Sequence, residues 1–280
     1  MSDMLVLVLI KRKVLSFMKI SELFSVEGKV VLITGGYKGI GMMIARGFVE
    51  NGAKVYITAR NEAGLQASAA QLGALGECVA ITSDLSSLEG IQAFSKEMLG
   101  LEDRIDVLIN NAGASSVAPF AEFSEEQWNS VVDINLKSPF FLTQALLPAL
   151  VRDDYVHEHS RVINVVSVDG LGTNPYETYS YSSSKAGLIH LTRTMARSLT
   201  QKGVNVCGLA PGTFPSDINF PARDNPEACA KVVPAGRVGK DDDMAAAAIY
   251  LSSKAGEYVI GETLTVDGGL VMATPYGIKG

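Results

Sequence analysis

Short apolar segments alternate with longer segments of helical periodicity along most of the 280-residue chain. Residues 29–34 form the first apolar segment and end in glycines, and residues 40–51 then carry apolar side chains at helical spacing. The same alternation predicts strands at 54–59, 78–82, 107–110, 161–166, 205–209 and 263–266, and helices at 61–72, 88–99, 124–137, 139–152, 178–201 and 241–251. The strands are almost continuously apolar, which indicates that helices cover both faces of a parallel sheet. Right-handed crossovers then predict a doubly wound α/β fold of about seven strands in a single domain.

Composition restricts the classes of function. Hydrophobic residues make up 47% of the chain and charged residues 19%, which suffices to bury a large core. The formal net charge is -6, and no basic face of the kind that binds nucleic acid is visible. The cysteines, Cys78, Cys207 and Cys229, are widely spaced, so neither a disulfide framework nor a metal centre is predicted. This cysteine usage fits a reducing compartment, and we expect a cytoplasmic protein.

We interpret residues 1–22 as an N-terminal extension and residues 23–280 as a dinucleotide-binding catalytic domain. The chain contains no run of about 18 apolar residues, so no membrane span is predicted. The apolar segment 4–10 precedes the basic residues 11–13, which reverses the order of a secretory signal. Import into an organelle and an oligomer contact are the alternative roles of this extension.

The first strand runs into the glycine-rich segment 34–41, with the sequence TGGYKGIG. Ligands of doubly wound sheets bind beyond the carboxyl ends of the strands, so the residues after each strand are the candidate site. Glycines allow a tight turn and let a pyrophosphate approach the N-terminus of the next helix. A plain glycine-rich turn without a ligand is the alternative.

The residues after the second and third strands bear on the choice of dinucleotide. An acidic residue at the end of the second strand would bind a ribose 2′-hydroxyl, but this chain has Arg60, which can pair with a 2′-phosphate. Lys38 could approach the same phosphate, and two solvated surface cations are the alternative. Asp84 could accept a hydrogen bond from an adenine amino group, or Asp84 or Ser86 could cap the next helix. Together these residues favour NADP.

Groups suited to chemistry follow the fourth and fifth strands. The fourth strand ends in Asn-Asn-Ala-Gly at 110–113, where small residues and amides suit a backbone close to a cofactor. Ser167 follows the fifth strand, and Tyr181 and Lys185 lie four residues apart, on one face of the predicted helix. An ammonium beside a phenol stabilises the phenolate, so we expect the pKa of Tyr181 to fall below its usual value of about 10. Such a tyrosine would serve as an acid or base near neutral pH.

In this order and spacing, the motifs resemble the short-chain dehydrogenase/reductase family from about Phe24 to Leu270. The motifs are TGGYKGIG at 34–41, NNAG at 110–113, Ser167, YSSSK at 181–185, PG at 211–212 and VDGG at 266–269. The resemblance implies a Rossmann-type fold, NADP(H) as cofactor, and a homo-oligomer, either a tetramer or a dimer. It also implies four catalytic residues: Ser167 polarises the substrate carbonyl, Tyr181 donates the proton in reduction, Lys185 holds the nicotinamide ribose, and Asn135 holds a water in a proton relay.

The resemblance further implies which residues contact the cofactor. They are Gly35, Tyr37, Lys38, Gly39, Ile40, Gly41, Arg60, Asp84, Leu85, Asn111, Ala112, Gly113, Tyr181, Lys185, Pro211, Gly212 and Ser216. Ser216 stands where threonine is commoner in the family and keeps the hydroxyl. Tyr179 is a rival for the role of Tyr181, but it lacks a lysine four residues later, so we reject it.

Within the family, the segments ITAR, SDLSS and APGTFPSD are similar to those of β-ketoacyl reductases, including the type associated with bacterial rhamnolipid synthesis. The implied reaction is transfer of the pro-S hydride of NADPH to a ketone, with a β-ketoacyl thioester or hydrophobic ketone as the small-molecule substrate. We expect residues 213–238 to form a mobile, mainly apolar flap over the substrate, with Phe120, Tyr176 and the turn after Ser167 as further walls. An NADP-dependent sugar or polyol dehydrogenase and a non-catalytic dinucleotide-binding protein are the alternative functions.

Overall fold

A computed structural model describes residues 19–273 of the protein. Seven strands form one parallel sheet in the order β3-β2-β1-β4-β5-β6-β7. The strands are β1 (Val30–Thr34), β2 (Lys54–Ala59), β3 (Cys78–Thr82), β4 (Val107–Asn110), β5 (Ser160–Val165), β6 (Val204–Pro211) and β7 (Thr263–Val266). The order reverses direction between β1 and β4, which confirms the predicted doubly wound sheet of seven strands in a single domain.

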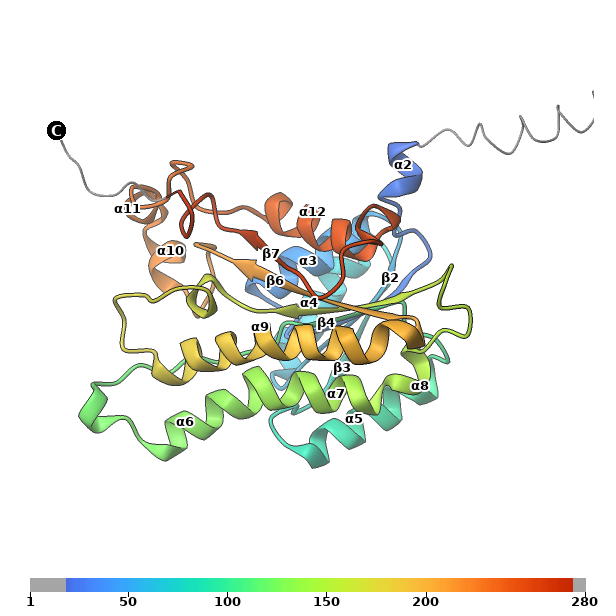
Figure 1. The fold of residues 1–280 in the computed structure, drawn as a ribbon, viewed down its shortest axis with the longest axis horizontal. Helices are drawn as coiled ribbons and strands as arrows, with labels where there is room; N and C mark the ends of the chain where they lie inside the picture. Colours follow the sequence, from blue (N-terminus) through green and yellow to red (C-terminus); the bar gives the residue numbers. More distant parts are fainter. Residues whose placement is uncertain (1–18, 274–280) are drawn as a thin grey trace, which may run out of the picture.

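Helices cover both faces of the sheet (Figure 1). One layer contains α3 (Gly39–Glu50), α4 (Glu62–Gly73) and α12 (Asp241–Ser252), and the other contains α5 (Leu88–Leu101), α7 (Ser138–Ala145) and α9 (Tyr179–Leu199). Side chains of β1 alternate between the layers: Val31 and Ile33 pack in the first and Leu32 in the second, all fully buried. Because both faces are buried, the strands need apolar residues at every position.

The segment between β4 and β5 differs from its prediction. Instead of helices at 124–137 and 139–152, the chain forms α6 (Glu125–Val132), a π-helical turn (Asp133–Lys137), α7 and the short α8 (Leu147–Leu150). The π-helical turn inserts extra backbone into an otherwise continuous helix, and such turns occur frequently at functional sites. Hydrophobic periodicity does not reveal an insertion of this kind, because the apolar positions on either side keep helical spacing.

The flap at 213–238 contains two short helices that the sequence analysis missed, α10 (Phe220–Asp224) and α11 (Pro226–Ala230). The side chains of Asn219 and Asn225 cap them by accepting hydrogen bonds from the backbone N–H groups of Ala222 and Ala228. Each helix also has a proline in its first turn, so an asparagine cap with a following proline was the available signal.

The first helix among the described residues is α2 (Ile20–Leu23), which spans the predicted boundary between the N-terminal extension and the catalytic domain at residue 22. Residues 1–18 lie outside the described residues, so the extension and its role stay predictions. Within residues 19–273, none of the helices combines the length and the apolar character that a membrane crossing requires.

Arg152 holds together the edge of the sheet opposite to the carboxyl ends of the strands. It is 7% exposed, and its guanidinium donates hydrogen bonds to the carbonyl oxygens of residues 105, 149, 150 and 151. The same group lies 3.4 Å from the Asp106 carboxylate, whose other oxygen accepts a hydrogen bond from the Val30 N–H. Arg152 therefore joins the end of α8 to the starts of β4 and β1.

We expect Arg152→Met to lower the free energy of unfolding by about 3–5 kcal/mol, because it leaves a buried carboxylate and several carbonyls without their donor. Urea unfolding followed by circular dichroism measures the loss. Arg104→Met is the matched control: Arg104 also pairs with Asp106 but its side chain is 49% exposed, so its removal should cost about 1 kcal/mol or less. Equal losses in the two variants would contradict the assignment.

Candidate active site

A cavity of about 1430 Å³ lies at the carboxyl ends of the strands. It is larger than a typical pocket for a drug-sized ligand and has room for a dinucleotide and a small substrate. Its lining includes every residue that the sequence analysis predicted to bind the cofactor, together with Ser167, Tyr181 and Lys185. Of the predicted catalytic and cofactor-binding residues only Asn135 is absent from the lining, and its amide oxygen lies directly behind Gly113, 3.1 Å from where a Cβ of that glycine would be.

The glycine turn after β1 fits a bound pyrophosphate. Gly35 and Gly39 have φ values of +65° and +52°, a region that side chains disfavour. A Cβ on Gly41 would lie 2.2 Å from the Gly35 carbonyl oxygen, so only glycine lets α3 start this close to the turn. No side chain caps the first turn of α3, which leaves its N–H groups for an anion.

The side-chain amide of Asn111 lines the cavity but makes its hydrogen bonds within the protein. Its side-chain amide donates hydrogen bonds to the carbonyl oxygens of Thr34 and Gly35, at 2.8 and 3.1 Å. In return, the Thr34 hydroxyl accepts hydrogen bonds from the N–H groups of Asn111 and Ala112, at 3.0 and 2.9 Å. The amide of Asn111 therefore holds the glycine turn against the end of β4.

The two cations predicted to meet a 2′-phosphate are in different environments. The Lys38 ammonium lies 2.5 Å from the Asp217 carboxylate, and this hydrogen bond raises the pKa of Lys38. Asp217 also accepts a hydrogen bond from Arg223, so Lys38 connects the glycine turn to the flap. Arg60 is exposed and forms no salt bridge within the described part of the chain. Arg60 is therefore the cation that stays available at the end of β2.

Asp84 lines the cavity after β3. The alternative prediction that Asp84 or Ser86 caps the next helix is wrong. Its carboxylate accepts hydrogen bonds from the backbone N–H and the hydroxyl of Ser86, at 3.0 and 2.7 Å. The N-cap of α5 is Ser87, whose hydroxyl accepts a hydrogen bond from the Gly90 N–H. One oxygen of Asp84 is thus used to shape the turn, and the sequence placed the cap one or more residues too early.

Lys185 is anchored at the end of β5. Its side chain is buried, at 4% exposure, and the ammonium donates a hydrogen bond to the Val165 carbonyl oxygen at 2.7 Å. Burial lowers the pKa of Lys185 to about 8, because a low-dielectric environment disfavours the charged form.

The expected fall in the pKa of Tyr181 is wrong for this structure. Burial is the main cause that raises the pKa of Tyr181 to about 12; a hydrogen bond with Ser167 lowers the pKa, and the charge of Asp169 adds to the rise. The ammonium of Lys185 lies 5.7 Å from the centre of the Tyr181 ring and donates its hydrogen bond to Val165 instead. Tyr181 consequently keeps its proton at neutral pH, which is the form that a proton donor needs.

Ser167 faces Tyr181 from the end of β5. It is 7% exposed, and its Oγ accepts a hydrogen bond from the Asp169 N–H at 3.1 Å. That contact occupies a lone pair of the Oγ, so the hydroxyl hydrogen that bonds to Tyr181 can rotate to donate to a bound oxygen atom. The Ser167 and Tyr181 hydroxyls can therefore both donate toward one oxygen atom in the cavity.

Asn135 lies in the π-helical turn and is 1% exposed. Its amide oxygen accepts a hydrogen bond from the Ala114 N–H, and its amide nitrogen donates to the Ala114 carbonyl and the Ser184 hydroxyl. The side chain thus fastens the segment after β4 to α9, next to Lys185. The water that the family resemblance assigns to Asn135 stays a prediction.

The substrate end of the cavity differs from its prediction. Tyr176, Phe214 and Phe220 line it as expected, but Phe120 does not and packs edge-on against Tyr179, with ring centres 5.5 Å apart. Asp169, Asn174 and Thr178 also line this end, so the turn after Ser167 contributes a polar wall. The signal that was missed is an acidic residue two positions after the candidate catalytic serine.

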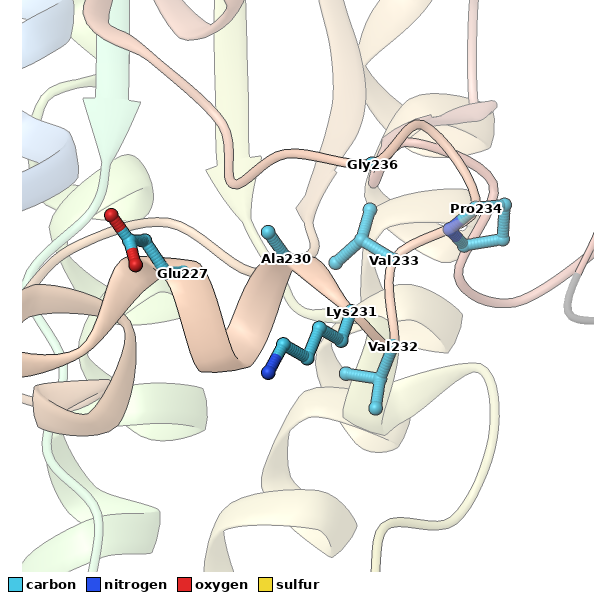
Figure 2. A pocket seen from close by; sticks show the side chains of 7 residues that line it. All are labelled: Glu227, Ala230, Lys231, Val232, Val233, Pro234 and Gly236. Atoms are coloured by element: carbon cyan, nitrogen blue, oxygen red, sulfur yellow. The ribbon is translucent and has the colours of Figure 1, made fainter.

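A second, shallower cavity of about 600 Å³ lies on the flap (Figure 2). Its lining residues are Glu227, Ala230, Lys231, Val232, Val233, Pro234 and Gly236. None of them is a predicted catalytic or cofactor-binding residue, but all lie in the predicted flap, and Val232 also lines the larger cavity. Between residues 19 and 273, no group of three or more histidine, cysteine, aspartate or glutamate side chains is placed to hold a metal ion.

We expect Lys185→Met to raise the free energy of unfolding at pH 7 by about 1–2 kcal/mol. The pKa of this lysine falls from 10.5 to about 8 on folding, and each unit corresponds to 1.36 kcal/mol, less the cost of the lost hydrogen bond to Val165. The unfolded chain binds the proton more tightly, so the free energy of unfolding of the wild-type protein is lowered below pH 8 and rises again as the pH increases toward 10.5. The gain should therefore shrink over that range. Urea unfolding at several pH values tests this, with the exposed Lys137→Met as control. A destabilised Lys185→Met variant would contradict it.

Comparison with known proteins agrees with the motifs. The sequence profile of a family described as short chain dehydrogenase matches residues 29–227. A rhamnolipids biosynthesis 3-oxoacyl-[acyl-carrier-protein] reductase from Pseudomonas aeruginosa is 40% identical over 249 residues, which cover 88% of this chain and 97% of that protein. A 3-oxoacyl-[acyl-carrier-protein] reductase from Vibrio cholerae is 37% identical, covering 89% of this chain and 99% of that protein.

Solved structures give the same result. The Pseudomonas aeruginosa RhlG/NADP active-site complex has a TM-score of 0.86 and 39% identity, covering 90% of this chain and 99% of that one. A gluconate 5-dehydrogenase from Burkholderia cenocepacia, in complex with NADP and tartrate, has a TM-score of 0.82 and 32% identity, covering 91% of this chain and 100% of that one. The resemblance to ketoreductases is thereby confirmed, and the chain belongs to the short-chain dehydrogenase/reductase family.

Proposed function

We propose that this protein is an NADPH-dependent reductase that transfers a hydride to the ketone of a β-ketoacyl thioester or a related neutral ketone. The observation that carries the proposal is the convergence of the Ser167 and Tyr181 hydroxyls on one cavity, beside the buried Lys185 ammonium. The 3-oxoacyl reductases among the relatives support the reaction class and the β-ketoacyl substrate.

The fit of the residues supports NADP as the cofactor. The glycine turn and the uncapped start of α3 would hold the pyrophosphate, and Arg60 would pair with the 2′-phosphate. The solved Pseudomonas aeruginosa relative is an NADP complex, which supports the same choice. Bound NADPH would supply the hydride.

The chain's own residues would supply the proton and hold the substrate. Ser167 and Tyr181 donate hydrogen bonds to the carbonyl oxygen, where negative charge develops during reduction. Tyr181 keeps its proton at neutral pH because of burial, so it is ready to act as the acid. The ammonium of Lys185, held at the end of β5 by the Val165 carbonyl oxygen, would hold the nicotinamide ribose beside Tyr181.

Two alternatives are weaker. An NADP-dependent sugar or polyol dehydrogenase is favoured by the polar wall of Asp169, Asn174 and Thr178, and a gluconate 5-dehydrogenase is among the structural relatives. A non-catalytic dinucleotide-binding protein would not need the buried Lys185 beside Tyr181. The homo-oligomer and the cytoplasmic location stay predictions.

We expect Tyr181→Phe to lower kcat for ketone reduction at least a hundredfold, because general acids contribute about 10²–10⁴-fold. The affinity for NADPH should change less than threefold, because the ring is retained. Oxidation of NADPH at 340 nm and fluorescence titration of NADPH give the two readouts. Tyr179→Phe is the matched control and should keep near wild-type activity. More than a tenth of wild-type kcat in Tyr181→Phe would refute the assignment.

We expect Arg60→Asp to lower the ratio of kcat/KM for NADPH over NADH by about 10–100-fold, because it removes the partner of the 2′-phosphate and adds a repelling charge. Lys38→Met should change this ratio less than threefold, because Lys38 is already paired with Asp217. Initial rates with both dinucleotides measure the ratios. An unchanged ratio in Arg60→Asp, or a larger effect of Lys38→Met, would remove Arg60 from this role.

A further inference from the structure

Asp169 lies on the substrate side of the catalytic residues and has no role in the mechanism above. It belongs to the short helical turn Val168–Gly170, and its N–H donates to the Ser167 Oγ at 3.1 Å. Its side chain lines the cavity and is close enough to Tyr181 for its charge to raise the pKa of that phenol. A group bound to Ser167 and Tyr181 therefore shares the cavity with Asp169, the residue whose N–H contacts the Ser167 Oγ.

The surroundings of Asp169 are polar but contain no countercharge. Asn174 donates a hydrogen bond to the carboxylate and another, at 3.1 Å, to the Thr178 hydroxyl, which in turn contacts Ser182 at 3.2 Å. Within the described residues, no lysine, arginine or histidine forms a salt bridge with Asp169, and Tyr181 is the titratable group beside it. Burial raises the pKa of Asp169, and the hydrogen bond from Asn174 opposes the rise.

A carboxylate without a cationic partner, such as that of Asp169, is stabilised by a hydrogen-bond donor that a ligand supplies. A carboxylate offers about four lone-pair positions, and one donor from Asn174 leaves most of them to water or to a bound molecule. When a substrate displaces that water, the lost hydrogen bonds must be replaced, since unpaired buried acceptors are costly. A negatively charged substrate would be disfavoured, because two like charges would lie in one cavity.

We propose that Asp169 is a specificity-determining residue that selects ketones carrying a hydroxyl group next to the carbonyl and disfavours ketones that carry a carboxylate. The inference rests on the proposed reductase function and narrows its substrate class. The hydroxyl donates to Asp169 while the ketone oxygen accepts from Ser167 and Tyr181. The polar wall and the apolar flap then serve different parts of one substrate.

Three soluble probes test the inference: ethyl acetoacetate, ethyl 4-hydroxyacetoacetate, which adds one hydroxyl beside the ketone, and the acetoacetate anion. For the wild-type protein we expect kcat/KM to favour the hydroxylated ester about tenfold, as for a site built to hydrogen-bond a hydroxyl. Asp169→Leu should bring this ratio close to one. Asp169→Asn should keep most of the preference, because its amide oxygen still accepts, and should raise kcat/KM for acetoacetate about tenfold.

Thermal unfolding and NADPH titration of each variant separate these effects from misfolding, and should Asp169→Leu fail to fold, the acetoacetate result with Asp169→Asn decides. A wild-type protein that reduces both esters equally, or Asp169→Leu retaining the preference, would overturn the inference and leave the reductase function standing. So would an unchanged rate with acetoacetate in Asp169→Asn. Failure of the wild-type protein to oxidise NADPH with either ester would remove the proposed function itself, and the inference with it.

Discussion

The hydrogen bond from the Lys185 ammonium to the Val165 carbonyl oxygen joins α9 to the end of β5 and orients the lysine side chain in the site. Val165 is the last residue of β5, and Ser167 follows it two residues later. Tyr181 lies one helical turn before Lys185 on the same face of α9. This 2.7 Å contact thus lies where the strand end that leads to the serine meets the helix face that carries the tyrosine.

The fold and the composition of the site could be predicted from sequence because both follow from local patterns. Continuous apolar runs marked six of the seven strands within one residue, and β6 extends two residues further, to Pro211, than its prediction. The convergence of the strand ends follows from parallel topology alone. For this reason Arg60, Ser167 and Tyr181, which are far apart in the sequence, could be assigned to one cavity before the structure was known.

What the sequence could not predict depends on tertiary neighbours. The pairing of Lys38 with Asp217 joins residues 179 positions apart, and nothing local indicates it. The pKa of Tyr181 depends on how deeply the phenol is buried, which outweighs the effect expected from a lysine one turn away. Likewise, the caps at Asn219 and Asn225 and the π-helical turn around Asn135 alter the backbone without changing the hydrophobic pattern.

The hydrogen bonds among Thr34, Asn111 and the glycine turn have a thermodynamic consequence. They fix the cradle for the pyrophosphate within the folded chain, so the entropy of ordering that loop is lost during folding and not when a ligand arrives. The flap is held to this turn by half-exposed ion pairs of Asp217 with Lys38 and Arg223, contacts worth about 0–1 kcal/mol each in water. The dinucleotide end of the cavity is therefore preorganised, so a dinucleotide meets a rigid receptor. The flap needs little free energy to move, so small movements can accommodate differently shaped ketones.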